Sequence, residues 1–188
     1  TINRQAVVTR NNPVVTEADA LASLTVGNGH FATTVDVTGL QSYPFDYEAG
    51  VPLNAMSDWG WHSFKNTKGL TPAETERTMN LGHGRDEVFA VEYKTDGRNK
   101  EATEYFRANP HRLNLGTIGL MLADKDGKQI PLKELKNVRQ EQALWDGTIE
   151  SRFTADGTPV EVTTACMSDK DAIFARIKSP LLHEGRAA

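Results

Sequence analysis

The clearest alternation of hydrophobic and polar positions lies just after the first pair of glycines. In residues 33–38, Thr33, Val35 and Val37 alternate with more polar side chains. A period of two that is rich in β-branched residues is typical of a strand, because these side chains lose rotamer freedom in a helix. The pattern predicts two strands joined by a tight glycine turn at residues 27–29.

The second half of the chain alternates almost throughout. Asp-Gly pairs at residues 146–147 and 156–157 favour hairpins, because glycine accepts a positive φ. Strands are expected at residues 113–123, 138–145, 148–154, 160–167 and 172–177. A strand spacing of roughly ten residues is typical of a sandwich. We therefore expect an all-β fold with minor helices, an antiparallel β-sandwich or supersandwich with one or two short helices.

Helical signals are few. Residues 16–19 have the pattern of a short helix start, and residues 71–74 form a capping box with proline in the first helical position. Ala102, Tyr105 and Phe106 recur at helical spacing, and the segment should end before Asn109-Pro110. One amphipathic helix is expected there.

The remaining segments of the first half are less regular. Residues 41–58 lack periodicity and predict a long ordered loop, which leads to a strand at residues 59–64. Phe89, Val91 and Tyr93 alternate with polar residues and predict a further strand.

Length and charge limit the possible partners. The 188 residues have a net charge of -4 with both signs interspersed, so we expect neither nucleic acid nor a membrane surface as partner. No apolar run approaches the roughly 20 residues that span a bilayer. The chain lacks an initiator Met, which is expected equally of a mature or trimmed product and of a cloning boundary.

Cofactor and metal motifs are weak. Residues 27–32 fit a dinucleotide fingerprint, but a strand follows where that motif requires a helix. The five histidines are scattered without metal-ligand spacing. Cys166 stands alone and shares the side-chain parity of Val160, Val162 and Thr164, which predicts a buried, inert thiol. We expect no cofactor, no metal and no intrachain disulfide.

Two clusters could contact a ligand. Trp59 and Trp61 could stack on the apolar face of a sugar while His62 hydrogen-bonds its hydroxyls, or both tryptophans could fill the core or a domain interface. His111 and Arg112 follow the expected helix and could cap carbonyls, bridge to a neighbouring domain or reach a substrate pocket. Both alternatives stay open for these five residues, which are the carbohydrate-binding or domain-interface candidates.

Four segments carry a family resemblance: residues 25–41, 57–64, 109–116 and 144–162. Together they resemble the N-terminal β-sandwich domain, of the supersandwich or galactose-mutarotase-like type, of bacterial six-hairpin glycoside hydrolases. The catalytic domain of that family is an (α/α)6 toroid. The resemblance implies carbohydrate metabolism and a periplasmic or secreted location.

The resemblance also implies that catalysis lies outside this chain. Twelve helices of about 11 to 12 residues do not fit beside the expected strands, so no catalytic residue is assigned. We expect residues 1–188 to form a single β-sandwich domain, an N-terminal fragment of a larger enzyme. Its role would be to pack against the toroid domain and shape the cleft for an oligosaccharide or polysaccharide. The alternatives are a stand-alone carbohydrate-binding module or a mutarotase-like sugar epimerase.

Overall fold

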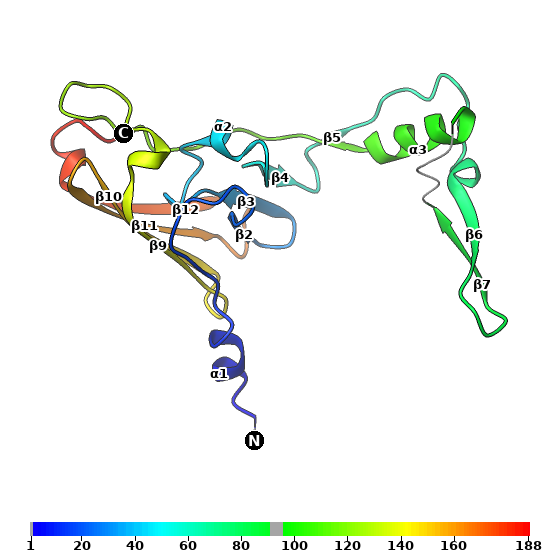
Figure 1. The fold of residues 1–188 in the computed structure, drawn as a ribbon, viewed down its shortest axis with the longest axis horizontal. Helices are drawn as coiled ribbons and strands as arrows, with labels where there is room; N and C mark the ends of the chain where they lie inside the picture. Colours follow the sequence, from blue (N-terminus) through cyan, green and yellow to red (C-terminus); the bar gives the residue numbers. More distant parts are fainter. Residues whose placement is uncertain (1, 91–95) are drawn as a thin grey trace. The chain divides into compact units, whose positions relative to one another are not determined.

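The computed structural model describes residues 2–90 and 96–188 (Figure 1). The described residues form two compact units within the chain. The first unit runs up to Trp59 and resumes over Asn114–Ala188, and the second lies within Gly60–Leu113. The expected all-β class with minor helices is confirmed, because antiparallel strands dominate and the helices are few and short.

The first unit contains two antiparallel sheets. The larger sheet has the order β1 (Val14–Val15), β9 (Lys136–Ala143), β10 (Thr148–Ala155), β11 (Thr158–Cys166) and β12 (Ile173–Lys178). The smaller sheet has the order β2 (Leu24–Gly27), β3 (Phe31–Val35) and β4 (Ala55–Ser57). The meander predicted from residue 138 onward is therefore confirmed, as are the two strands around the glycine turn.

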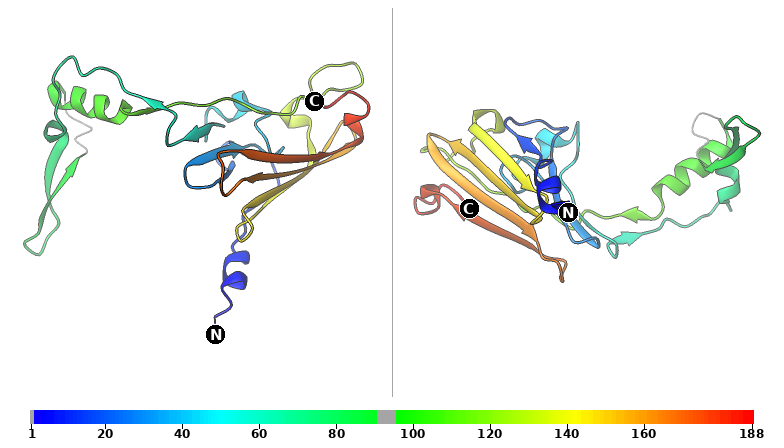
Figure 2. Two further views of the ribbon diagram at one scale, coloured as in Figure 1. Left: turned by 180° about the vertical axis from the view of Figure 1, so that it is seen from behind. Right: turned by 90° about the horizontal axis from the view of Figure 1, so that it is seen from below.

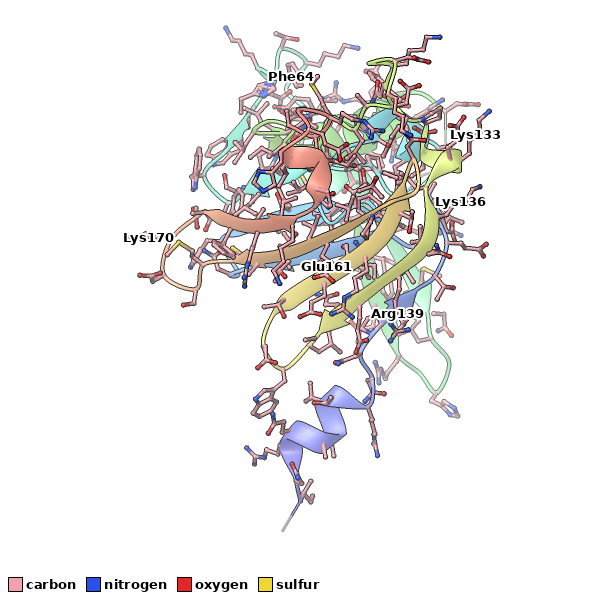
Figure 3. All side chains as sticks on the ribbon, turned by 90° about the vertical axis from the view of Figure 1, so that its left-hand side faces the viewer. Phe64, Lys133, Lys136, Arg139, Glu161 and Lys170 are labelled. Atoms are coloured by element: carbon pink, nitrogen blue, oxygen red, sulfur yellow. The ribbon has the colours of Figure 1, made fainter. Side chains whose placement is uncertain are left out.

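The hairpin between β10 and β11 shows why the pattern predicts this sheet. Asp156 and Gly157 have φ values of 45° and 76°, the two positive angles that a tight primed turn requires. Along β10, Ile149 and Phe153 point inward and are buried, while Glu150 and Arg152 point outward. Figure 3 shows Glu161 and Arg139 on the outer face of the sheet. That face is charged and exposed to solvent. On it, Glu161 lies 3.9 Å from Arg152 and 3.8 Å from Lys178.

The two sheets pack face to face in the first unit. Figure 2 shows β2 and β3, in blue, against one face of the larger sheet. Val26 and Val35 from the smaller sheet pack on Ile149 from the larger one. A larger cluster continues beside them and contains Val37, Leu40, Tyr43, Leu120, Leu122, Ile130, Leu135, Phe153, Ala155, Val160, Val162, Leu181 and Ala187. Burial of these apolar side chains is the main stabilising term of the unit.

A buried polar loop follows β3 and connects the layers. The carboxylate of Asp36 is fully buried and accepts hydrogen bonds from the backbone N–H of Thr38 at 2.8 Å and of Tyr43 at 2.8 Å. Gln140 of β9 is also buried, and its Nε2 donates to the carbonyl of Asp36 at 2.7 Å. Residues 36–43 are thus fixed against the larger sheet by hydrogen bonds, since buried polar groups without partners are costly.

Gly39 allows this loop to approach the sheet. Its φ is +84°, and a Cβ atom there would lie 2.8 Å from the Ser151 Oγ and 3.1 Å from a methyl of Val162. Thr164 donates its hydroxyl hydrogen to the Gly39 carbonyl. Only glycine fits both the backbone conformation and the space.

Residues 113–123 were predicted as a strand, and this is wrong. They are extended but join no ladder, apart from isolated bridges at Leu122 and Ala123. Their backbone groups bond to the buried loop instead, since Ile118 N–H donates to the Gln41 side chain at 3.1 Å and Leu120 N–H to the Ser42 hydroxyl at 2.9 Å. Only Leu120 and Leu122 of this segment are buried, whereas Leu115, Ile118 and Met121 are exposed, so the alternation does not mark a sheet face.

Two other predictions for the first unit need correction. Residues 16–19 form no helix, because the Asp19 side chain accepts from Leu21 N–H at 2.8 Å and closes a local turn. Residues 41–58 are not only loop, since they contain α2 (Pro44–Tyr47) and β4. The other helical segments are α1 (Arg4–Thr9) and the 3₁₀ turns η2 (Leu132–Glu134) and η3 (Pro180–Leu182).

The second unit is built from short elements. They are β5 (Trp61–His62), η1 (Pro72–Thr75), β6 (Glu76–Asn80), β7 (Asp86–Ala90), α3 (Arg98–Ala108) and β8 (His111–Arg112). The predicted amphipathic helix is confirmed as α3, and the capping box begins the 3₁₀ turn η1. Arg98 of α3 binds Glu74 of η1, and Lys68 lies 3.0 Å from Glu101. Phe89 lies in β7, whereas Val91 and Tyr93 fall outside the described residues.

We predict that Asp36→Ala lowers the free energy of unfolding by about 3 kcal/mol, because it leaves buried N–H donors without an acceptor. Burial raises the pKa of Asp36, while the hydrogen bonds from Thr38 and Tyr43 oppose this. The stability that Asp36 contributes through its raised pKa is therefore full below the ordinary pKa and is lost as pH rises through the raised pKa. Urea unfolding at several pH values measures both effects. Asp46→Ala, at an exposed carboxylate, should change stability little.

We predict that Gly39→Ala costs about 3 kcal/mol, from the positive φ together with the overlap with Ser151 and Val162. Gly127→Ala is the matched control, since Gly127 has a φ of +77° and open space around it. It should cost only about 1 kcal/mol. Equal losses of stability in the two variants, measured by thermal unfolding, would show that packing at Gly39 is not decisive.

Candidate functional site

The five residues predicted from sequence divide between the two units. Trp59 belongs to the first unit, whereas Trp61, His62, His111 and Arg112 belong to the second. The strand predicted at residues 59–64 is limited to Trp61–His62, so Trp59 does not alternate with Trp61 on one strand. Each group is therefore described by itself.

In the second unit, strand pairing brings together four of the predicted residues. Trp61 pairs with Arg112 and His62 pairs with His111 in the β5–β8 ribbon. The ring centroids of His62 and His111 are 5.1 Å apart, and those of His62 and Phe64 are 4.8 Å apart. Residues separated by about fifty positions thus form one aromatic surface.

Neither tryptophan fills the core of its unit. Trp59 is 61% exposed and Trp61 is 51% exposed. The core alternative for these side chains is therefore wrong, because core residues of the first unit are almost fully buried. A contact with a sugar or with a neighbouring domain remains a prediction for both residues.

Trp59 is exposed but held in place. Its indole Nε1–H donates to Asp171 Oδ2 at 2.7 Å, and Asn28 Nδ2 donates to Asp171 Oδ1 at 2.9 Å. His30 Nδ1 lies 2.6 Å from Asp58 Oδ2. We call these five residues, Asn28, His30, Asp58, Trp59 and Asp171, the Trp59 frame. They come from the β2–β3 turn, the segment after β4 and the β11–β12 turn.

The glycine turn at residues 27–29 positions the frame. Asn28 Oδ1 accepts from the backbone N–H of His30 at 2.9 Å and of Phe31 at 2.8 Å, which fixes the orientation of its amide. Gly29 has a φ of +96°, and β3 begins at Phe31. The turn is thus a strand connection, and no helix N-terminus is present there to hold a pyrophosphate.

Hydrogen bonding sets the charge of the frame. The hydrogen bonds from Asn28 and Trp59 lower the pKa of Asp171, so this carboxylate is ionised at neutral pH. The hydrogen bond to Asp58 and the charge of Asp58 raise the pKa of His30 above its usual range. The exposed indole therefore donates to an ionised carboxylate, and the His30–Asp58 pair belongs to the same frame.

The other chemistry of the described residues is limited. Within residues 2–90 and 96–188, no group of three His, Cys, Asp or Glu side chains is arranged to hold a metal ion. Cys166 ends β11, is partly buried beside Val26 and Ile149, and has a pKa raised by burial. A separate cleft of about 560 Å³ lies in the first unit beside Tyr43 and Leu120.

The frame residues other than Trp59 were missed by sequence reasoning. The sequence places Asn28 in the glycine turn, in the dinucleotide-like motif and in the first resemblance segment, and Asp171 falls between the strands expected at residues 160–167 and 172–177. The two lie more than 140 positions apart, so no local spacing could indicate that they meet. The available signal was indirect, since an Asn between two glycines is often needed for its side chain as well as for the turn.

Comparison with protein-family models gave no match, and comparisons with curated proteins and with solved structures gave no significant match. In the part of the chain that the structure describes, no helix is both long enough and apolar enough to cross a bilayer.

We predict that His30 titrates above its ordinary pKa of 6.5, because Asp58 stabilises the imidazolium. The stabilisation by this pair is full below the ordinary pKa and is lost as pH rises through the raised value. Asp58→Asn should return the midpoint toward the ordinary value in an NMR titration of the imidazole signals. Asp146→Asn removes an equal charge from the exposed β9–β10 turn and should leave His30 unchanged. An identical His30 midpoint in the wild type and Asp58→Asn would contradict the assignment.

Proposed function

We propose that this chain is a non-catalytic β domain of a carbohydrate-active enzyme, a glycoside hydrolase. In this proposal it binds an oligosaccharide or polysaccharide and packs against an α,α-toroid domain of the same polypeptide, whose sugar cleft it shapes. The catalytic residues lie outside the chain, and the enzyme is periplasmic or secreted. The sequence resemblance and the antiparallel sandwich of the first unit support this class of protein.

One observation carries the binding part of the proposal: Trp59 is fixed by a hydrogen bond although most of it is exposed to solvent. Because Asp171 binds the only polar group of the indole, the exposed side-chain surface is carbon. Sugar rings present C–H faces that pack on such surfaces, and their hydroxyls find partners in the carboxylates alongside. A side chain ordered in advance also loses little entropy on binding.

The second unit supports a domain neighbour. All described residues of β6 and β7 are exposed, including Met79, Val88 and Phe89. A two-stranded hairpin alone is only marginally stable in water, and exposed apolar side chains on it favour a covering partner. The aromatic surface of the β5–β8 ribbon, with Trp61 and Phe64 exposed, suits the same role.

A stand-alone carbohydrate-binding module is the second candidate, and the fixed, exposed Trp59 favours it equally. A sugar epimerase is less favoured. That chemistry needs a His and Glu pair in a concave sheet, and none of the five histidines lies in a strand of either sheet of the first unit.

We predict that the full chain binds oligosaccharide with a change in tryptophan fluorescence, and that Trp59→Ala weakens binding at least about tenfold, or about 1.4 kcal/mol. Trp145→Ala is the matched control, because Trp145 is a similarly exposed tryptophan, 49% exposed, in the β9–β10 turn and is not one of the frame residues. It should bind like the wild type. Calorimetry against a panel of neutral and acidic hexasaccharides measures this.

Three outcomes of that experiment are informative. Loss of binding in Trp61→Ala instead of Trp59→Ala would keep carbohydrate binding but assign it to the β5–β8 ribbon. An equal loss of affinity in Trp145→Ala and Trp59→Ala would indicate that binding is specific neither to the Trp59 frame nor to the β5–β8 ribbon. No heat with any member of the panel would sink the binding part of the proposal.

A further inference from the structure

The composition of the Trp59 frame indicates which class of carbohydrate it binds. This inference rests on the proposed function. The frame is built from three segments of the first unit. The β2–β3 turn and the segment after β4 belong to the smaller sheet, and the β11–β12 turn belongs to the larger sheet. Figure 3 shows Lys170, next to Asp171, at the outer end of the β11–β12 hairpin. The Lys170 carbonyl accepts from Asn28 Nδ2 at 3.2 Å, so backbone and side chain together connect the two turns.

Asp171 retains the capacity to bind a ligand. A carboxylate has about four acceptor positions on its two oxygens. In the frame each oxygen of Asp171 accepts one hydrogen bond, from Asn28 on Oδ1 and from Trp59 on Oδ2. About one position on each oxygen is left, which suits two neighbouring hydroxyl groups of a sugar.

The protein donors cannot easily be replaced or rotated. The Asn28 amide is fixed because its Oδ1 already accepts two backbone N–H groups. The Trp59 ring is fixed through its only donor. A ligand therefore meets an acceptor-rich edge beside an apolar face, without having to order either of them.

The charges of the frame select against one class of sugar. The carboxylate that would contact the sugar is Asp171, which is ionised because Asn28 and Trp59 donate to it. A uronic acid or a sulfated sugar would bring a further anion to this carboxylate, and like charges at short distance repel. The neighbouring cations are His30 and the flexible, exposed Lys170. A neutral sugar brings only hydroxyl donors and an apolar ring face.

We propose that the Trp59 frame is a binding site for neutral oligosaccharides, in which a sugar ring stacks on the Trp59 indole and two of its hydroxyls donate to Asp171. Anionic glycans are excluded from it. His30 modulates this exclusion, because a protonated imidazole offsets part of the negative charge at acidic pH.

The experiment uses the full chain and isothermal calorimetry at pH 8. The neutral probes are cellohexaose, xylohexaose and mannohexaose, and the anionic probe is hexagalacturonate. We expect at least one neutral probe to bind at least tenfold more tightly than hexagalacturonate. Asp171→Asn should weaken the affinity for that neutral probe at least fivefold, because it removes one acceptor. It should also reduce the difference in affinity between that probe and hexagalacturonate, because it removes the negative charge.

Asp169→Asn is the matched control. Asp169 is an exposed carboxylate in the same β11–β12 turn and is not part of the frame. If a general field effect sets the selectivity, Asp169→Asn and Asp171→Asn will behave alike, and the site assignment is overturned. Circular dichroism melting of each variant shows that the fold is retained.

The remaining outcomes separate this inference from the proposed function. Tight binding of hexagalacturonate, or unchanged affinity in both Asp171→Asn and Trp59→Ala, overturns the inference while leaving carbohydrate binding intact. Binding that is lost only in Trp61→Ala does the same. The absence of binding by every probe overturns both.

Discussion

The buried carboxylate of Asp36 is the interaction on which the first unit depends. It accepts from the backbone of its own loop, and the loop then presents carbonyl groups to Gln140 and Thr164 of the larger sheet. The apolar cluster can close only if this polar segment is fully satisfied, since unpaired polar groups in such a position would cancel much of the gain from burial. Packing and hydrogen bonding therefore specify the same arrangement of the two sheets.

The stacked sheets in turn bring distant turns together. The β2–β3 turn and the β11–β12 turn meet through Asn28 and Asp171, and the result is an indole that is ordered and yet exposed. The charged outer face of the larger sheet has no comparable feature in the described residues. Its ion pairs lie on a flat solvated surface and contribute little to stability. The polar groups of the first unit that could contact a ligand are thus concentrated at the β2–β3 and β11–β12 turns.

The sequence predicted what depends on local periodicity and turn chemistry. It predicted the hairpin at Asp156-Gly157, the helix α3 and the all-β class. It failed at residues 113–123, where the backbone hydrogen-bonds to a loop instead of a neighbouring strand. It also failed at Asp19, where a side chain closes a turn instead of capping a helix. The frame around Trp59 depends on contacts across more than a hundred residues, which no local pattern contains.

The arrangement of the Trp59 frame couples ligand binding to the stability of the first unit. Its members are drawn from both layers, so any guest that touches Trp59 and Asp171 together also bridges the layers. By mass action, a guest that binds only the folded chain raises its resistance to unfolding in proportion to the logarithm of guest concentration. Ligand binding at the Trp59 frame and the stability of the first unit are therefore thermodynamically linked.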